Sequence, residues 1–107
     1  MAGKVIEITA SNWESEVVNS DKPVLIDFWA AWCAPCRIMA PVMEEIAEKY
    51  GDKVKVGKLN VDEYPEIASR YGVMSIPTFI LFEKGVPKKF AVGARPMESL
   101  LQELGIS

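Results

Sequence analysis

One apolar run, Val24–Trp29, restricts the fold of this 107-residue chain more than any other feature. The run has the length of a strand and almost no alternation of polar with apolar residues, which is typical of a central strand covered on both faces. Asp27 is the one acidic residue that interrupts it. We therefore expect a sheet that carries helices on both faces, with this run near its centre.

The rest of the chain alternates between strand and helix patterns. Ser11 followed by Glu14 has the spacing of a capping box and predicts a helix through Val17. Proline and glycine residues mark the boundaries of the remaining elements. These are strands over residues 5–8, 53–59, 78–82 and 88–92, a turn over 83–86, and helices over 65–71, closed by Gly72, and 96–104, followed by Gly105.

A longer helix is expected from near Cys33 to Tyr50, because apolar residues recur there at three- and four-residue spacing. Pro41 lies within it, but the apolar stripe continues on both sides, so the pattern predicts one kinked helix rather than two. The element order is βαβαβα followed by ββα. We expect a single α/β domain over 1–107, a three-layer αβα sandwich with a mixed sheet.

The chain has two cysteines, Cys33 and Cys36, and no histidine. That composition excludes Ser-His-Asp and Cys-His catalysis, c-type haem attachment and histidine-based zinc sites. A chain of this length buries enough surface to fold without a structural metal or several disulfides. The cysteines are therefore available for chemistry.

The net charge is −3, and the 12 basic residues are spread along the sequence. This argues against a surface for nucleic acid or anionic membranes. The N-terminus lacks an apolar segment of signal-peptide length, and no stretch approaches the roughly 18 apolar residues of a membrane span. We expect a soluble protein of a reducing compartment, the cytoplasm, and a mature organellar protein would have the same features.

The segment Trp32–Cys36 follows the buried strand and begins a helix, and its two cysteines have three interpretations. A structural disulfide closing so short a loop would contribute only about 2 kcal/mol. A metal site would need ligands from a second copy or an external thiol, since two thiolates are too few. The third interpretation, thiol–disulfide exchange, is the one we favour.

The helix start predicts different roles for the two sulfurs. Cys33 would face unpaired backbone N–H groups and the positive end of the helix dipole, which stabilise a thiolate without histidine, so it should attack. Cys36, one turn further and flanked by apolar residues, should be more buried and suited to resolving a mixed disulfide. Pro35 stiffens the loop between them.

Asp27 is either an outward-facing surface acid or a buried carboxyl group with a raised pKa. Because the strand around it is apolar on both faces, we favour burial and expect Asp27 to take the proton of Cys36. Lys58, near the end of the neighbouring strand, is a candidate charge partner, although an ordinary surface lysine is an equal alternative. Ile76–Pro77 precedes a central strand, where proline either ends the pairing or is cis, and base rates alone favour a trans bond.

Many of these residues resemble those of the thioredoxin family in order and spacing. The resemblance covers essentially the whole chain and rests on Asp27–Arg37, Pro41, Asn60–Asp62, Tyr71–Val73, Ile76–Thr78, Phe82–Gly85 and Val92–Ala94. It implies a central sheet of five strands flanked by four helices, with a cis bond before Pro77. It also implies a monomeric protein-disulfide reductase without a cofactor or metal, whose partners are protein disulfides and a thioredoxin reductase.

The resemblance also implies roles for particular residues. Asp27 becomes the buried proton-transfer acid and Lys58 its partner. A shallow apolar groove around the exposed sulfur of Cys33 would dock the substrate backbone, lined by Trp32, Ile76, Pro77 and Gly93.

Two positions depart from the family pattern. Ala34 stands where the family usually has glycine, and the resemblance implies that Ala34 and Pro35 tune the redox potential. Arg37 replaces the usual lysine and keeps the charge. An accessory subunit that binds through the same groove, or a metal-bridged dimer, remains an alternative to the reductase.

Overall fold

Five strands form one mixed sheet in the computed structural model, which describes residues 3–107. The sheet order is β1-β3-β2-β4-β5, with β1 and β3 parallel to β2, β4 antiparallel to β2, and β5 antiparallel to β4. The strands are β1 (Ile6–Glu7), β2 (Val24–Trp29), β3 (Lys55–Asn60), β4 (Thr78–Glu83) and β5 (Val86–Val92). The mixed sheet and the central place of Val24–Trp29 are confirmed.

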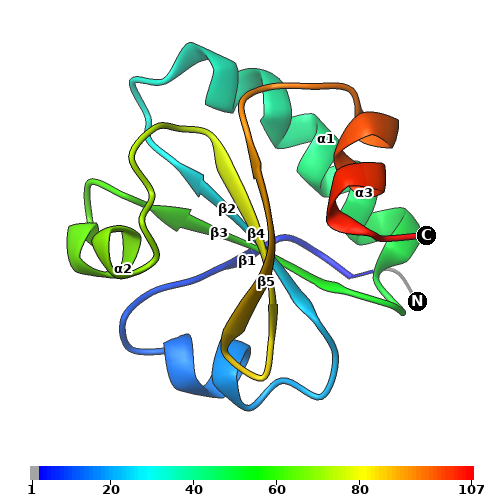
Figure 1. Ribbon diagram of the computed structural model, residues 1–107, viewed down its shortest axis with the longest axis horizontal. Coiled ribbons are helices and arrows are strands. Elements are labelled where there is room, and N and C mark those ends of the chain that lie inside the picture. Colours follow the sequence, from blue (N-terminus) through cyan, green and yellow to red (C-terminus); the bar gives the residue numbers. More distant parts are fainter. Residues whose placement is uncertain (1–2) are drawn as a thin grey trace.

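Four helices cover the two faces of this sheet: η1 (Glu14–Val18), of π type, α1 (Ala34–Tyr50), α2 (Pro65–Arg70) and α3 (Met97–Leu104). The α1 and α3 helices pack on one face, against residues such as Leu25 and Phe79. The η1 and α2 helices pack on the other, against Ile26 and Phe28 (Figure 1). The predicted three-layer sandwich is confirmed.

The alternation of side chains along β2 places Asp27 on the α1 side of the sheet. Successive side chains of a strand point to opposite faces, and Leu25 lies in the cluster with α1 and α3 whereas Ile26 lies in the opposite cluster. Asp27 therefore shares the face of Leu25. Lys58, which is its register partner in β3, lies on the same face as Val56.

The predicted capping box at Ser11 and Glu14 is wrong. A reciprocal pair forms between Thr9 and Asn12 instead: the N–H of Thr9 donates to Asn12 Oδ1 at 2.7 Å, and the N–H of Asn12 donates to Thr9 Oγ1 at 3.2 Å. Ser11 only contacts the Thr9 hydroxyl, at 3.0 Å. The turn therefore begins two residues earlier than the capping box suggests.

Several element boundaries differ from the predictions by one or two residues. The first strand is shorter than 5–8. The third begins at Lys55 rather than 53, because the N–H groups of Lys53 and Val54 both donate to the carbonyl of Tyr50 and close the end of α1. The α1 helix continues through Pro41 as one helix, as predicted. Lys84 and Gly85 both have positive φ and form the expected tight hairpin turn.

Candidate active site

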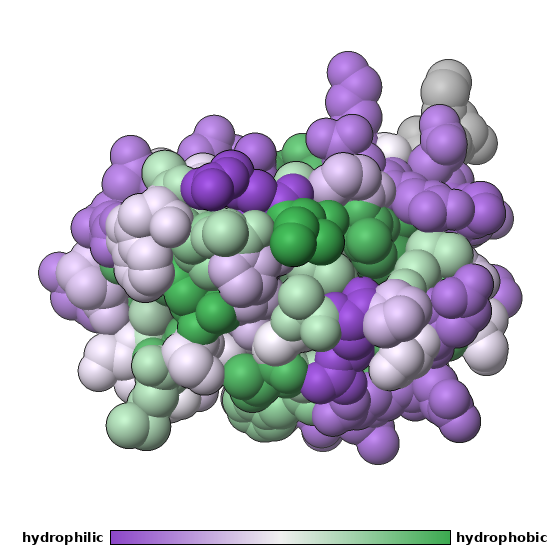
Figure 2. Space-filling view, turned by 90° about the horizontal axis from the view of Figure 1, so that it is seen from above, coloured by the Kyte–Doolittle hydropathy of each residue, from purple (hydrophilic) through white to green (hydrophobic). Residues whose placement is uncertain are grey.

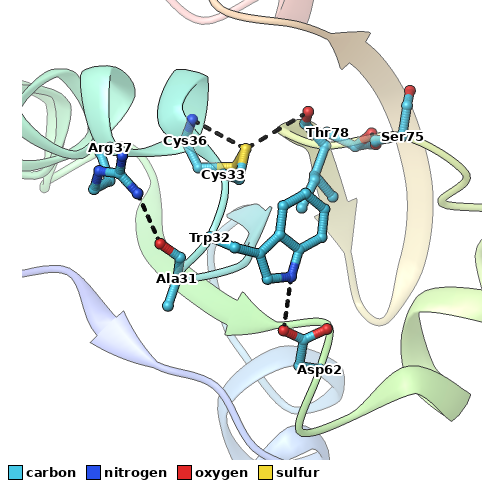
Figure 3. The surroundings of a disulfide bond; sticks show 9 residues. Ala31, Trp32, Cys33, Cys36, Arg37, Asp62, Ser75 and Thr78 are labelled. Atoms are coloured by element: carbon cyan, nitrogen blue, oxygen red, sulfur yellow. Dashed lines mark hydrogen bonds between the residues drawn. A yellow bond between two sulfur atoms is a disulfide. The ribbon is translucent and has the colours of Figure 1, made fainter.

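The two cysteines lie at the N-terminus of α1, as predicted. Cys33 is the N-cap residue, with extended backbone, and Cys36 lies in the first turn. Their sulfurs form a disulfide, with Cα atoms 5.3 Å apart. The N–H of Cys36 donates to Cys33 Sγ at 3.2 Å (Figure 3). This donor and the helix dipole stabilise negative charge on the Cys33 sulfur once the disulfide is reduced.

Both cysteines are covered in the disulfide form. Only 3% of Cys36 and 4% of Cys33 is exposed. The expected burial of Cys36 is confirmed, but the expected exposure of Cys33 is not found, because Val61 and Ile76 pack against this pair. The sulfur of Cys33 lies 3.8 Å from the carbonyl oxygen of Ile76.

Asp27 is buried, with 4% of its surface exposed, so the interpretation as a surface acid is wrong. Burial raises the pKa of its carboxyl group from 3.8 to about 7, and the positive charge of Lys58 opposes that rise. Its Oδ1 atom is buried and has no hydrogen-bond partner among the described residues. The carboxyl group is thus placed to exchange a proton near neutral pH.

A cavity of about 110 Å³ connects Asp27 with Cys36. Lys58, Arg37 and Glu44 also line it and supply its charged groups. The volume exceeds what one water molecule needs, and the unpartnered Asp27 oxygen offers such a water an acceptor. Cys33 is not among the residues that line this cavity, so the cavity distinguishes the two sulfurs where exposure does not.

Lys58 is exposed, and it is also the register partner of Asp27 across β2 and β3. Its Nζ lies 5.4 Å from the centre of the Trp29 ring, a cation–π contact. The surface lysine and the charge partner of Asp27 are therefore the same side chain.

The residues predicted to line a substrate groove lie at the end of the sheet where α1 begins. The Trp32 side chain is 68% exposed, and its indole N–H donates to Asp62 at 2.9 Å (Figure 3). The Ile76–Pro77 bond is cis, as the family resemblance implied. The N–H of Gly93 donates to the carbonyl of Pro77 at 2.8 Å, so the two loops are joined.

Hydrophobic and hydrophilic surface areas adjoin one another on the face of the molecule seen in Figure 2. Met74, two residues before Ile76, is 96% exposed, and Ile38 on α1 is 67% exposed. The residues between the cysteines, Ala34 and Pro35, are exposed as well. A partner that docks here meets both apolar surface and charge.

Sequence reasoning missed a role for Asp62 and underestimated Arg37. Asp62 follows the carboxyl end of β3, beside the end of β2 that leads to Trp32, and this shared edge could have predicted their contact. Arg37 donates from Nη1 to the carbonyl of Ala31 at 2.8 Å and so ties α1 to the loop before Cys33.

Residues 3–107 contain neither a cluster of metal ligands nor a membrane-spanning helix. No group of three or more histidine, cysteine, aspartate or glutamate side chains is arranged there to hold a metal ion. Within the same range, no helix has the length and apolar character needed to cross a membrane.

Comparison with known proteins gives the family of the chain. Residues 4–105 match the family described as Thioredoxin. The sequence is 57% identical over 97 residues to the thioredoxin of Alicyclobacillus acidocaldarius subsp. acidocaldarius, covering 91% of each chain. It is 51% identical over 98 residues to thioredoxin 1 of Nostoc sp. (strain PCC 7120), covering 92% of each. The bifunctional thioredoxin reductase/thioredoxin of Mycobacterium leprae is 50% identical over 103 residues, which are 96% of this chain and 22% of that protein. The chain therefore belongs to the thioredoxin family.

Proposed function

We propose that this thiol–disulfide oxidoreductase reduces disulfide bonds of proteins through Cys33 and Cys36. The observation that carries the proposal is the bond from the Cys36 N–H to Cys33 Sγ at the start of α1. In the reduced protein this donor holds the Cys33 sulfur as a thiolate. The thiolate attacks one sulfur of a substrate disulfide, forming a Cys33–substrate disulfide and releasing the other substrate sulfur as a thiolate, which takes a proton from water.

Cys36 then resolves the mixed disulfide. Its thiol gives a proton to the Asp27 carboxylate through water in the shared cavity, and its sulfur attacks Cys33 Sγ. The Cys33–Cys36 disulfide forms and the second substrate thiolate leaves, so two electrons have passed from the dithiol to the substrate. Because Asp27 must be ionised to accept the proton, resolution should slow as the pH falls below about 7. Lys58 favours that ionised form.

Protein substrates dock on the face around Trp32, Ile76, Pro77 and Gly93. The exposed Trp32 ring and the half-buried Ile76 offer apolar contact beside Cys33. Ala34 and Pro35 tune the potential through the first turn of α1, where alanine favours the helix by up to about 1 kcal/mol over glycine. Titration of the Ala34→Gly variant against glutathione tests this, and an unchanged potential would exclude a tuning role for Ala34.

The electron donor we propose is a thioredoxin reductase. The name of the fused Mycobacterium leprae relative, which pairs a thioredoxin with a thioredoxin reductase in one chain, supports this partner. We further propose that the protein acts as a monomer in the cytoplasm, where a reducing environment keeps the dithiol available. Sedimentation equilibrium of the reduced protein tests the monomer.

Reduction of insulin, with dithiothreitol as electron donor, tests the function. The unaltered protein should accelerate the precipitation of insulin chains, Cys33→Ser should abolish the acceleration, and Cys36→Ser should accumulate a mixed disulfide visible by mass spectrometry without reductant. Turnover by Cys33→Ser equal to that of the unaltered protein would refute the assignment. A mixed disulfide that accumulates on Cys36 in Cys33→Ser, and not on Cys33 in Cys36→Ser, would reverse the two roles.

A further inference from the structure

The loop between β5 and α3 is held by an arginine that the exchange reaction does not use. Arg95 Nη2 donates to the carbonyl of Val92 at 2.7 Å. Arg95 Nη1 forms an ion pair with Glu103 on α3. The guanidinium group therefore joins the last residue of β5 to α3. Figure 1 shows the loop that connects these two elements.

These contacts fix one particular peptide unit. The carbonyl of Val92 and the N–H of Gly93 belong to the same peptide plane, and that N–H donates to the carbonyl of Pro77 at 2.8 Å. The plane is thus held at its oxygen by Arg95 and at its nitrogen by the residue next to Ile76. Gly93 has φ +96°, a backbone conformation that is open to rearrangement in glycine unless neighbours restrain it.

Arg95 contributes less to stability than its two contacts suggest. Its Nε atom is buried and has no hydrogen-bond partner among the described residues. A buried donor without an acceptor is unfavourable, and an apolar side chain of similar length would avoid it. The favourable contacts are therefore partly offset in the stability of the fold, while their effect on the orientation of the peptide remains.

We propose that Arg95 is a positioning residue for protein substrates: by holding the Val92–Gly93 peptide against Pro77, it keeps the docking face around Cys33 in one shape. The inference rests on the proposed function, because it assigns the loop to substrate docking. A protein disulfide has to fit this face before exchange. A small disulfide such as hydroxyethyl disulfide reaches the sulfur without such docking.

The Arg95→Met variant tests the proposal by comparing these two substrates. Loss of one side chain to backbone hydrogen bond should raise KM for insulin by about 2- to 10-fold and leave kcat unchanged. The rate with hydroxyethyl disulfide should not change. Arg95→Lys should recover part of the insulin KM, because lysine can donate to the carbonyl of Val92 without the forked geometry of arginine.

Lys49→Met is the matched control, because it removes an ion pair with Glu45 that lies exposed on α1. It should leave the insulin KM unchanged. An unchanged insulin KM in Arg95→Met, or an equal loss with insulin and with hydroxyethyl disulfide, would overturn the proposal.

Amide hydrogen exchange separates this inference from the function itself. The Gly93 N–H should exchange about 2- to 10-fold faster in Arg95→Met than in the unaltered protein, whatever the substrate. Failure of the unaltered protein to reduce insulin would refute the reductase and leave this measurement in place. Unchanged exchange at Gly93 would refute the positioning role even in an active reductase.

Discussion

Replacing Asp27 with asparagine should stabilise the folded protein at neutral and alkaline pH. Burial raises the pKa of this carboxyl group from 3.8 to about 7. The folded protein thus holds the Asp27 proton more tightly than the unfolded chain does. At a pH between these two pKa values, unfolding releases the Asp27 proton. The free energy of unfolding therefore falls as the pH rises through this interval. Asparagine does not titrate, and the variant escapes that loss.

The magnitude follows from the same two pKa values. Each pH unit between them corresponds to about 1.4 kcal/mol, so the interval from 3.8 to about 7 corresponds to about 4 kcal/mol. The loss should begin near pH 4, be complete near pH 7 and stay constant above that. Asparagine and aspartate have similar volumes, so the packing difference between the two proteins is small. Because packing does not involve a proton, this difference adds an offset that does not depend on pH.

Urea unfolding of the oxidised proteins from pH 4 to pH 9 measures this difference. The free energy of unfolding of Asp27→Asn, minus that of the unaltered protein, should grow from pH 4 to about pH 7 and then level off. Asp52→Asn, at an exposed position after α1, controls for the loss of one negative charge. Two parallel curves over the whole range would mean that Asp27 ionises as readily in the fold as in the unfolded chain, and would remove it as a proton acceptor.

Two further predictions concern the same end of the sheet. Lys58→Met should raise the pKa of Asp27 above 7, because the charge of Lys58 is what lowers it; the carboxyl carbon signal followed by NMR gives the midpoint, and an unshifted midpoint would contradict the pairing. Gly93→Ala should lower the free energy of unfolding by about 1 kcal/mol, because an alanine at φ +96° is strained. Denaturant unfolding checks this, and since the space around the added methyl group is open, an unchanged midpoint would show that the backbone there adapts freely.

The parts of the fold that depend on local pattern were predictable from the sequence. Val24–Trp29 is a central strand because a strand with apolar side chains on both faces is stable only where both faces are covered. The positions of Cys33 and Cys36 at a helix start follow from the pattern on either side of them. Asp27 was predictable as a buried acid for the same reason, since a strand without an exposed face has nowhere to place a charge in water.

Features that depend on the course of the chain beyond the local pattern were not predictable in this way. Ser11–Glu14 and Thr9–Asn12 have the same spacing, and the choice between them depends on where the chain leaves β1. The cover over Cys33 comes from Ile76, which is remote in sequence. Sequence spacing alone does not say that Val61 and Ile76, from two separate loops, pack over this sulfur.

Nor did any local pattern single out Arg95. Its acceptor, the carbonyl of Val92, is a backbone group, which any residue type would provide, so the sequence does not indicate it. Its ionic partner, Glu103, is one of two acidic residues on α3, and the sequence does not distinguish it from Glu98. Only the packing of α3 against β5 brings the three together.

The residues that cover both sulfurs affect how fast the disulfide exchanges with thiols, and not only where the equilibrium lies. A thiolate must approach along the axis of the S–S bond to break it, and the residues around Cys33 and Cys36 leave only a few per cent of either one in contact with solvent. Small thiols should therefore react with the bond more slowly than a partner whose surface fits this face, although the position of equilibrium is the same for both. At the concentrations of an assay, dithiothreitol and glutathione still bring the disulfide to equilibrium. Where free thiols are scarce, most electrons enter from a molecule that docks beside Cys33.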